Sequence, residues 1–111
     1  MGNTDVVGEF YSAFDSQDAA AADRLMADEY RFTSPQDDHI YKAEWLRRCF
    51  PTREHFMSRS LLAIEDIGGD DVVLYYEYEL TSGERYRNAE VITVRDGRVV
   101  ETRVFFGGQE R

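Results

Sequence analysis

Hydrophobic and polar residues alternate most regularly near the end of the chain, between residues 84 and 108. Alternation with a period of two is typical of a β-strand that buries one face. The pair Asp96-Gly97 interrupts it and indicates a tight hairpin turn, because both central residues of such a turn need positive φ. The faces expected to meet the core carry Tyr86, Asn88, Glu90, Ile92 and Val94 on the first strand, and Val100, Thr102, Val104 and Phe106 on the second.

The N-terminal part of the chain shows the period of α-helices instead. In the first predicted helix, apolar residues recur at intervals of three and four: Val7, Phe10, Tyr11 and Phe14. Asp18 caps a second helix, AAAADRLMADE, whose alanine run has the highest helix propensity available. A third helix is predicted over residues 42–50, where Pro51 ends it.

The remaining segments predict strands. A short strand over residues 30–33 is followed by a polar loop over 36–39, and longer strands are expected over about 57–67 and 72–80. Helices first and an antiparallel meander afterwards indicate an α+β fold. A strongly curved sheet wrapped against the N-terminal helices would form a cone whose mouth is a pocket. The length of 111 residues fits a single domain spanning 1–111.

Composition narrows the classes of partner. The formal net charge of −9 disfavours binding to nucleic acids and to anionic membrane surfaces. The single cysteine, Cys49, excludes an internal disulfide and a cysteine metal cluster. No apolar run is long enough to span a bilayer, and no secretory signal is recognisable, so we expect a cytoplasmic protein. We expect no cofactor and no metal site.

The sharpest candidate for chemistry is Glu90, with Asn88 two residues before it on the same predicted face. A buried carboxyl is costly unless it has partners or a task. In the functional interpretation Glu90 has a raised pKa and exchanges a proton with a ligand oxygen while Asn88 orients it. In the structural interpretation, Glu90 binds a tyrosine hydroxyl or an arginine and serves the fold alone.

A second candidate is the loop that would lie at the rim of the cone, with Asp37, Asp38 and His39. A carboxylate beside a histidine can move protons; alternatively, the segment is an acidic turn that bonds local backbone. Five aromatic residues are predicted either to line an apolar pocket or to fill it as core: Phe32, Trp45, Tyr76, Tyr78 and Phe106. Phe105 would be exposed on the outer face of the sheet, which suggests a partner surface.

Taken together, these segments resemble a nuclear transport factor 2-like, or SnoaL-like, domain. The resemblance rests on EFYSAFDSQDAAAADRLMADEYRFTSP, SPQDDHIYKAEWLRRCFP and RYRNAEVITVRDGRVVETRVFFGG, which cover almost the whole chain. It implies a cystatin-like α+β barrel with a curved, mixed or antiparallel sheet. It also implies a pocket for a small hydrophobic molecule and, as in many relatives, a homodimer formed through the outer sheet face.

The superfamily includes ketosteroid isomerases, polyketide cyclases, scytalone dehydratase and limonene epoxide hydrolase. In the isomerases an aspartate precedes a proline after the first strand, and that position here is Ser34. The first-helix tyrosine falls near Phe10, with Tyr11 adjacent and expected to face elsewhere, while the protonated aspartate of the penultimate strand falls at Glu90. Steroid isomerisation by the family's usual residues is therefore disfavoured.

Three functions remain open at this point. The first is an isomerase, cyclase or dehydratase that acts by general acid–base chemistry on a hydrophobic, oxygen-bearing substrate, with Glu90 and either Asp38 or His39 transferring protons. The second is a ligand-binding protein without catalysis. The third is a dimeric accessory module whose own aromatic side chains fill the cavity. The scaffold supports unrelated chemistries, so the resemblance does not choose among them.

Overall fold

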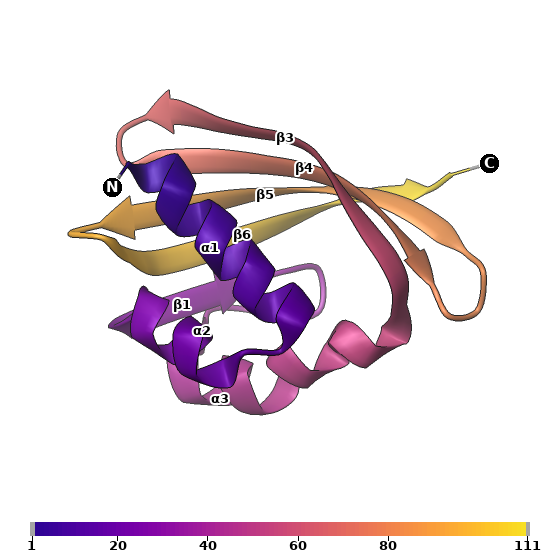
Figure 1. The fold of residues 1–111 in the computed structure, drawn as a ribbon, viewed down its shortest axis with the longest axis horizontal. Helices are drawn as coiled ribbons and strands as arrows, with labels where there is room; N and C mark the ends of the chain where they lie inside the picture. Colours follow the sequence, from indigo (N-terminus) through magenta and orange to yellow (C-terminus); the bar gives the residue numbers. More distant parts are fainter. Residues whose placement is uncertain (1, 111) are drawn as a thin grey trace.

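The computed structural model describes residues 2–110 and places the helices against one face of a curved sheet (Figure 1). The helices are α1 (Asn3–Ser16), α2 (Ala19–Leu25), α3 (Lys42–Arg48) and the 3₁₀ helix η1 (Phe50–His55). The strands are β1 (Met26–Thr33), β2 (Ile40–Tyr41), β3 (Phe56–Gly68), β4 (Asp71–Leu80), β5 (Arg85–Arg95) and β6 (Arg98–Gln109).

The sheet is mixed and open, with the strand order β2-β1-β6-β5-β4-β3. Only β1 and β6 pair in parallel within the described chain, for example at Phe32 and Thr102. Helix α1 crosses the concave face, whereas the β4–β5 turn and the end of β6 extend beyond the helices (Figure 1). The predicted α+β class and the curved sheet wrapped around N-terminal helices are confirmed.

The C-terminal hairpin forms as predicted, with one difference in register. Asp96 and Gly97 have φ of 53° and 75°, as their turn requires. Val94 pairs with Val99 while Thr93 pairs with Glu101, so Val100 is an extra residue in β6. This bulge buries Val99 and turns Val100 to the outer face, and the prediction that Val100 faces the core is therefore wrong.

Two helices are shorter than predicted. Helix α2 ends at Leu25 rather than near residue 29, because Met26 begins β1 and pairs with Val99 of β6. Burial of Met26 against the sheet outweighs the local helix propensity of the segment. Helix α3 ends at Arg48, and Phe50, predicted to be its last residue, starts η1 instead.

The core lies between the helices and the covered part of the sheet. Helix α1 contributes four buried residues to it: Val6, Val7, Phe10 and Ala13. Val7 and Phe10 belong to the predicted stripe, whereas Tyr11 and Phe14 are only partly buried against the core. Trp45 of α3 joins the layers, with ring centroids 5.5 Å from Phe10 and 5.8 Å from both Tyr30 and Phe50. In the part of the chain that the structure describes, no helix is long and apolar enough to cross a bilayer.

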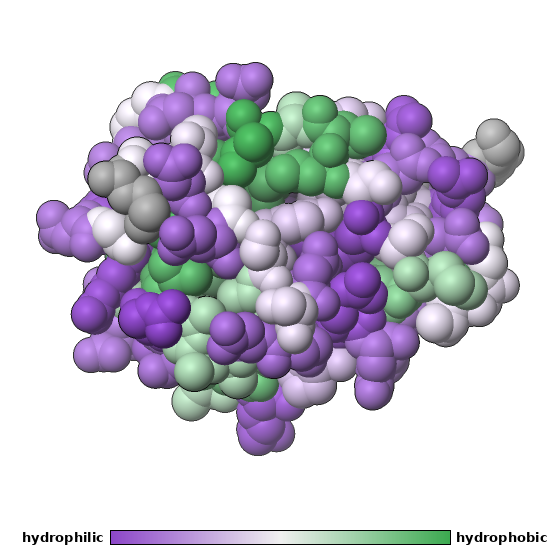
Figure 2. Space-filling model, in the orientation of Figure 1, coloured by the Kyte–Doolittle hydropathy of each residue, from purple (hydrophilic) through white to green (hydrophobic). Residues whose placement is uncertain are grey.

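The edge strand β3 leaves apolar side chains at the surface. Leu61 and Leu62 are 38% and 47% exposed. A shallow hollow between α1 and β3 is lined by Leu61, Ile64 and Gly8. Figure 2 shows an apolar area on this side of the molecule, surrounded by hydrophilic residues.

Candidate functional site

A cavity of about 270 Å³ opens between the helices and the concave face of the sheet. Much of its wall is aromatic: Phe10, Tyr11, Phe14, Tyr30, Phe32, Trp45, Phe56 and Tyr76. Polar groups interrupt this wall at a few places, and its acidic residues are Asp37 and Glu90. A concave, mainly apolar cavity with a few converging polar groups is typical of a site for a small molecule.

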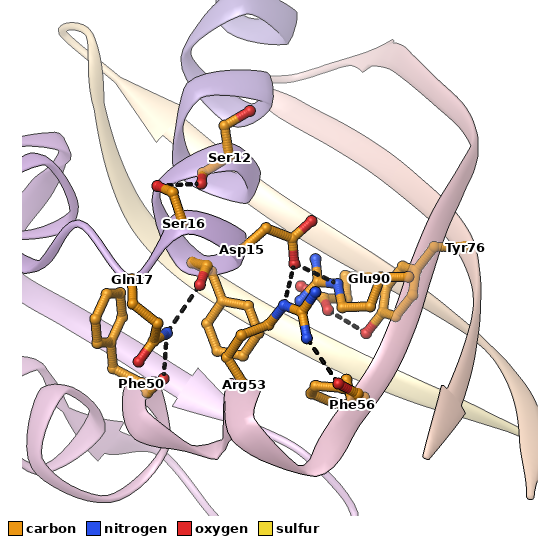
Figure 3. Close-up of polar contacts among 11 residues, drawn as sticks. Ser12, Asp15, Ser16, Gln17, Phe50, Arg53, Phe56, Tyr76 and Glu90 are labelled. Carbon is orange, nitrogen blue, oxygen red and sulfur yellow. Dashed lines mark hydrogen bonds and ion pairs between the residues drawn. The ribbon is translucent and has the colours of Figure 1, made fainter. Parts of the chain in front are cut away.

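Glu90 lies in this wall, as the alternation of β5 predicted. It neighbours Ile92, which is 1% exposed, on the concave face. The Tyr76 hydroxyl, from the adjacent strand β4, donates a hydrogen bond of 2.5 Å to Glu90 Oε2 (Figure 3). Tyr76 and Glu90 are diagonal neighbours across the β4–β5 pair, since Leu74 pairs with Glu90 and Tyr76 with Asn88.

Burial decides the protonation of this pair. Loss of water raises the pKa of Glu90 above its ordinary value of 4.5, while the hydrogen bond from Tyr76 and the charge of Arg59 partly oppose the increase. Burial also raises the pKa of Tyr76, and the neighbouring Glu90 charge raises it further. Both shifts are toward the neutral form, and a protonated Glu90 carboxyl can donate a hydrogen bond to a ligand oxygen.

Arg59 brings a cation into the same wall. Its side chain is 7% exposed, and its guanidinium carbon lies 4.0 Å from the centroid of the Tyr11 ring and 5.1 Å from that of Tyr76. Asp15 of α1 is 3.2 Å from Arg59 Nε and also 3.0 Å from Arg53 Nε (Figure 3). Arg53 donates from Nη1 to the Phe56 carbonyl, which fixes the start of the strand that carries Arg59.

Three hydroxyl groups in the wall are buried and have no hydrogen-bond partner among residues 2–110: those of Tyr11, Tyr30 and Thr102. Tyr30 and Thr102 are 0% and 2% exposed. Burial raises the pKa of Tyr30 and of Tyr11, so both phenols stay protonated near neutral pH. Buried polar groups are normally hydrogen-bonded, so these three hydroxyls can serve a polar group of a molecule that enters the cavity.

The loop after β1 contributes Asp37 to the cavity but not the two residues predicted as proton carriers. Asp38 and His39 lie 2.5 Å apart at the surface, with side chains 90% and 60% exposed, and neither lines the cavity. Asp37 has a side chain only 12% exposed and pairs with Arg48 Nη2 at 3.1 Å. The backbone turns between Ser34 and Asp37, and His39 has a positive φ of 50°. Consecutive side chains of this loop therefore point in different directions, with Asp37 toward the cavity and Asp38 and His39 toward solvent.

The predicted ligand-binding residues divide into two groups. Asn88, Phe32, Trp45 and Tyr76 line the cavity, as expected. Tyr78 and Phe106 do not line it. Both belong to a row of rings that continues along the concave face beyond the helices, with centroid distances of 5.4 Å from Tyr78 to Tyr86 and 5.6 Å from Tyr86 to Phe106. Phe106 is 55% exposed because β6 outruns the helices that would cover it.

Sequence reasoning missed Arg59, Tyr30 and Thr102 as polar groups of the site, and it directed Tyr11 elsewhere. One pattern in the sequence could have indicated Arg59. It lies two residues before Leu61 in a predicted strand, so the two side chains share a face, and that face is the inner one. Tyr30 and Thr102 come together only through the parallel β1–β6 pairing, which links distant segments. Local sequence patterns carry no information on such a pairing.

Two other chemistries find little support in the described residues. Burial raises the pKa of the Cys49 thiol to about 11, so Cys49 is not a thiolate near neutral pH. Within residues 2–110, no group of three or more His, Cys, Asp or Glu side chains has the geometry to hold a metal ion. The side chains at the cavity suit hydrogen bonding and proton transfer instead.

Comparison with known proteins gives a family and a fold. The model of a SnoaL-like domain matches residues 7–102. No curated protein matches the chain. Many solved structures do, among them an NTF2-like protein of unknown function from Cytophaga hutchinsonii, 18% identical, with a TM-score of 0.81 over 96% of this chain and 90% of that one.

Two further structures show the range of this fold. An NTF2-like protein from Burkholderia thailandensis is 25% identical, with a TM-score of 0.77 over 95% of this chain and 90% of that one. An LEH-like epoxide hydrolase from M. tuberculosis is 16% identical, with a TM-score of 0.77 over 94% of this chain and 77% of that one. At these identities the likeness is one of fold, and chemistry must be argued from the cavity itself.

Proposed function

We propose that this chain, which belongs to the SnoaL-like domain family, binds a small apolar, oxygen-bearing molecule in its cavity and moves a proton on it by general acid–base catalysis. The observation that carries the proposal is the Tyr76–Glu90 pair: a half-buried acid with a raised pKa at the wall of an open aromatic cavity. A protonated carboxyl group at this position can donate a hydrogen bond to a carbonyl oxygen as negative charge develops there.

The two acidic residues of the cavity have environments that separate their roles. Asp37 is ion-paired with Arg48 and so presents a carboxylate, whereas Glu90 has a neutral tyrosine as its hydrogen-bond partner. In the proposed step, a C–H bond next to a ligand carbonyl breaks and Asp37 takes the proton. The electron pair of the C–H bond forms a C=C bond and the π pair of the carbonyl moves to its oxygen, which gives an enolate whose oxygen accepts a hydrogen bond from the protonated Glu90 carboxyl. Return of the proton to the same carbon restores the ketone, and in a substrate with a second C=C bond conjugated to the enolate, return to the far carbon of that bond gives an isomer.

Exchange of hydrogen for deuterium tests this step without knowledge of the natural product. 4-Phenylbutan-2-one in D₂O is followed by proton NMR, and enzyme-dependent loss of the signals next to the carbonyl reports enolisation. Glu90→Gln is expected to slow the exchange by roughly 10²–10⁴-fold, the usual contribution of a positioned acid or base. The matched control is Glu77→Gln, on the neighbouring strand but the opposite face, which should exchange at the wild-type rate.

The same assay separates this proposal from simple ligand binding. If the ketone binds but wild type and Glu90→Gln give the same exchange rate, Glu90 is not the acid. A non-catalytic binding protein then becomes the better description. The buried hydroxyls of Tyr11, Tyr30 and Thr102 favour an accessible cavity over one filled by its own side chains. In a filled cavity these hydroxyls would normally bond to the side chains that fill it.

We also propose that two copies of the chain associate through the convex face of the sheet. Tyr75, Ala89 and Phe105 form an apolar cross-strand row there, and Tyr75 and Phe105 are 37% and 56% exposed. Phe105→Asp would place a charge in that row and is expected to give a monomer by light scattering after size exclusion. A variant that keeps the wild-type mass would show that the convex face is not the contact.

A further inference from the structure

We propose that Arg59 is the anion-binding group of the cavity and that the ligand is a carboxylic acid of one or two rings, held through its carboxylate. The inference rests on the proposed function, since it names a ligand class for the same cavity. It uses a residue to which that function gives no role. Three features of the cavity support it: the unused donors of Arg59, the local charge and the volume.

The first feature concerns hydrogen bonding. The Arg59 side chain is only 7% exposed, and its Nε is buried with no hydrogen-bond partner among residues 2–110. Its Nε lies 3.2 Å from Asp15 without the alignment of a hydrogen bond. Stacking on Tyr11 stabilises the cation but leaves its N–H groups unused. The planar guanidinium presents these donors in the arrangement that matches two carboxylate oxygens.

The second feature concerns charge. One carboxylate, Asp15, serves two cations, Arg53 and Arg59, so this end of the cavity carries one positive charge in excess. Around Asp37 the excess charge is negative, because the single cation Arg48 pairs with both Asp37 and Glu44. A ligand with one negative charge is therefore favoured with its carboxylate at Arg59 rather than beside Asp37. The raised pKa of Glu90 reduces the negative charge that this neighbour sets against Arg59.

The third feature concerns size. A cavity of about 150 Å³ holds benzene, and sites for drug-sized ligands begin near 300 Å³, so the cavity of about 270 Å³ fits one or two rings. Its aromatic wall suits the face of a ring. The unpartnered hydroxyl of Tyr11, whose ring stacks on the Arg59 guanidinium, supplies a further donor beside the proposed carboxylate.

The test compares two ligands of nearly the same size and shape, the anionic 3-phenylpropanoate and the neutral 3-phenylpropanamide, by calorimetric titration at pH 7. Wild type should bind the carboxylate at least about tenfold more tightly than the amide, as expected for hydrogen bonds to a charged group. Arg59→Met should abolish this preference. Arg85→Gln is the matched control: it removes an exposed cation that pairs with Glu77 on the convex face, outside the cavity wall, and should keep the preference.

Wild type alone can overturn the proposal, whether or not Arg59→Met folds. Equal or tighter binding of the amide would contradict it, and so would failure of the carboxylate to bind at millimolar concentration. A preference that survives unchanged in Arg59→Met would place the anion site elsewhere. Arg59→Lys keeps the charge but not the planar pair of donors and should retain only part of the preference. Deuterium exchange independent of Glu90, together with an Arg59-dependent preference, would refute the catalytic role and leave the ligand class standing.

Discussion

Two glutamates on neighbouring strands have opposite surroundings because they lie on opposite faces of one sheet. Glu77 of β4 is on the convex face, where it accepts a hydrogen bond of 2.5 Å from Arg85 and pairs with Arg87 at 3.5 Å. Both arginine side chains are about half exposed, at 57% and 47%. Glu90 of β5 is on the concave face and has the neutral Tyr76 as its hydrogen-bond partner.

The difference shows how the fold assigns chemistry. Solvent screens the ion pairs of Glu77, and such pairs contribute little to stability or function. The curved sheet and α1 shield Glu90 from much of the solvent, and this loss of water raises its pKa. The same residue type thus becomes a surface ion-pair partner on one face and a candidate acid on the other.

The largest effect is expected from truncating the concave face. Ile92→Ala removes a side chain that is 1% exposed and should lower the free energy of unfolding by about 2–5 kcal/mol. Val91→Ala, one residue away on the convex face, is the control and should cost clearly less because Val91 is only half-buried. Urea unfolding of the two variants measures both. Equal losses would mean that the two faces are not packed differently.

A smaller effect is expected from separating the Tyr76–Glu90 pair. Tyr76→Phe leaves a buried carboxyl without its hydrogen-bond donor and should cost about 1–3 kcal/mol. Glu77→Gln weakens screened pairs and should change the free energy of unfolding by about 0–1 kcal/mol. Chemical denaturation measures both changes. A larger loss in the free energy of unfolding for Glu77→Gln than for Tyr76→Phe would contradict the contrast between the two faces.

The pH dependence of stability gives a further contrast. Because the pKa of Glu90 is raised in the folded state, its contribution is fully present below the unfolded value near 4.5 and is lost as pH rises through the higher folded value. The stability of wild type should therefore fall relative to Glu90→Gln over this interval, by about 1.4 kcal/mol per pH unit. Arg59 and Tyr76 both face Glu90 and limit the interval. A wild type that gains stability relative to Glu90→Gln with rising pH would reverse the sign.

The smallest effects are expected at the exposed pair of the loop. Asp38→Asn and His39→Gln should each change the free energy of unfolding by less than about 0.5 kcal/mol and leave ketone exchange at the wild-type rate. Asp37→Asn, next in the chain but facing the cavity, should slow the exchange. A loss of exchange in Asp38→Asn with none in Asp37→Asn would restore the assignment first made from the sequence.

The sequence predicted correctly that the Glu90 side chain lies on the inner face of its strand. The strand alternates regularly and ends in the Asp96-Gly97 turn, so the turn and the alternation indicate the same face. The prediction failed at Val100, where one extra residue changes the face, and at Phe106, where the face is right but no helix reaches that far. The direction of Asp37 relative to Asp38 depends on backbone angles within a turn. The contacts of Arg59 depend on how α1 crosses the sheet, which no local pattern specifies.

The most direct measurement is an NMR titration of the side-chain carboxyl carbon of Glu90, assigned by comparison with Glu90→Gln. The account predicts that Glu90 titrates clearly above 4.5 in the folded protein, and that Tyr76→Phe, which removes a hydrogen bond favouring the charged form, raises its pKa further. A pKa at or below 4.5 would contradict the account, since Glu90 would then be an ordinary carboxylate and no candidate acid for the cavity.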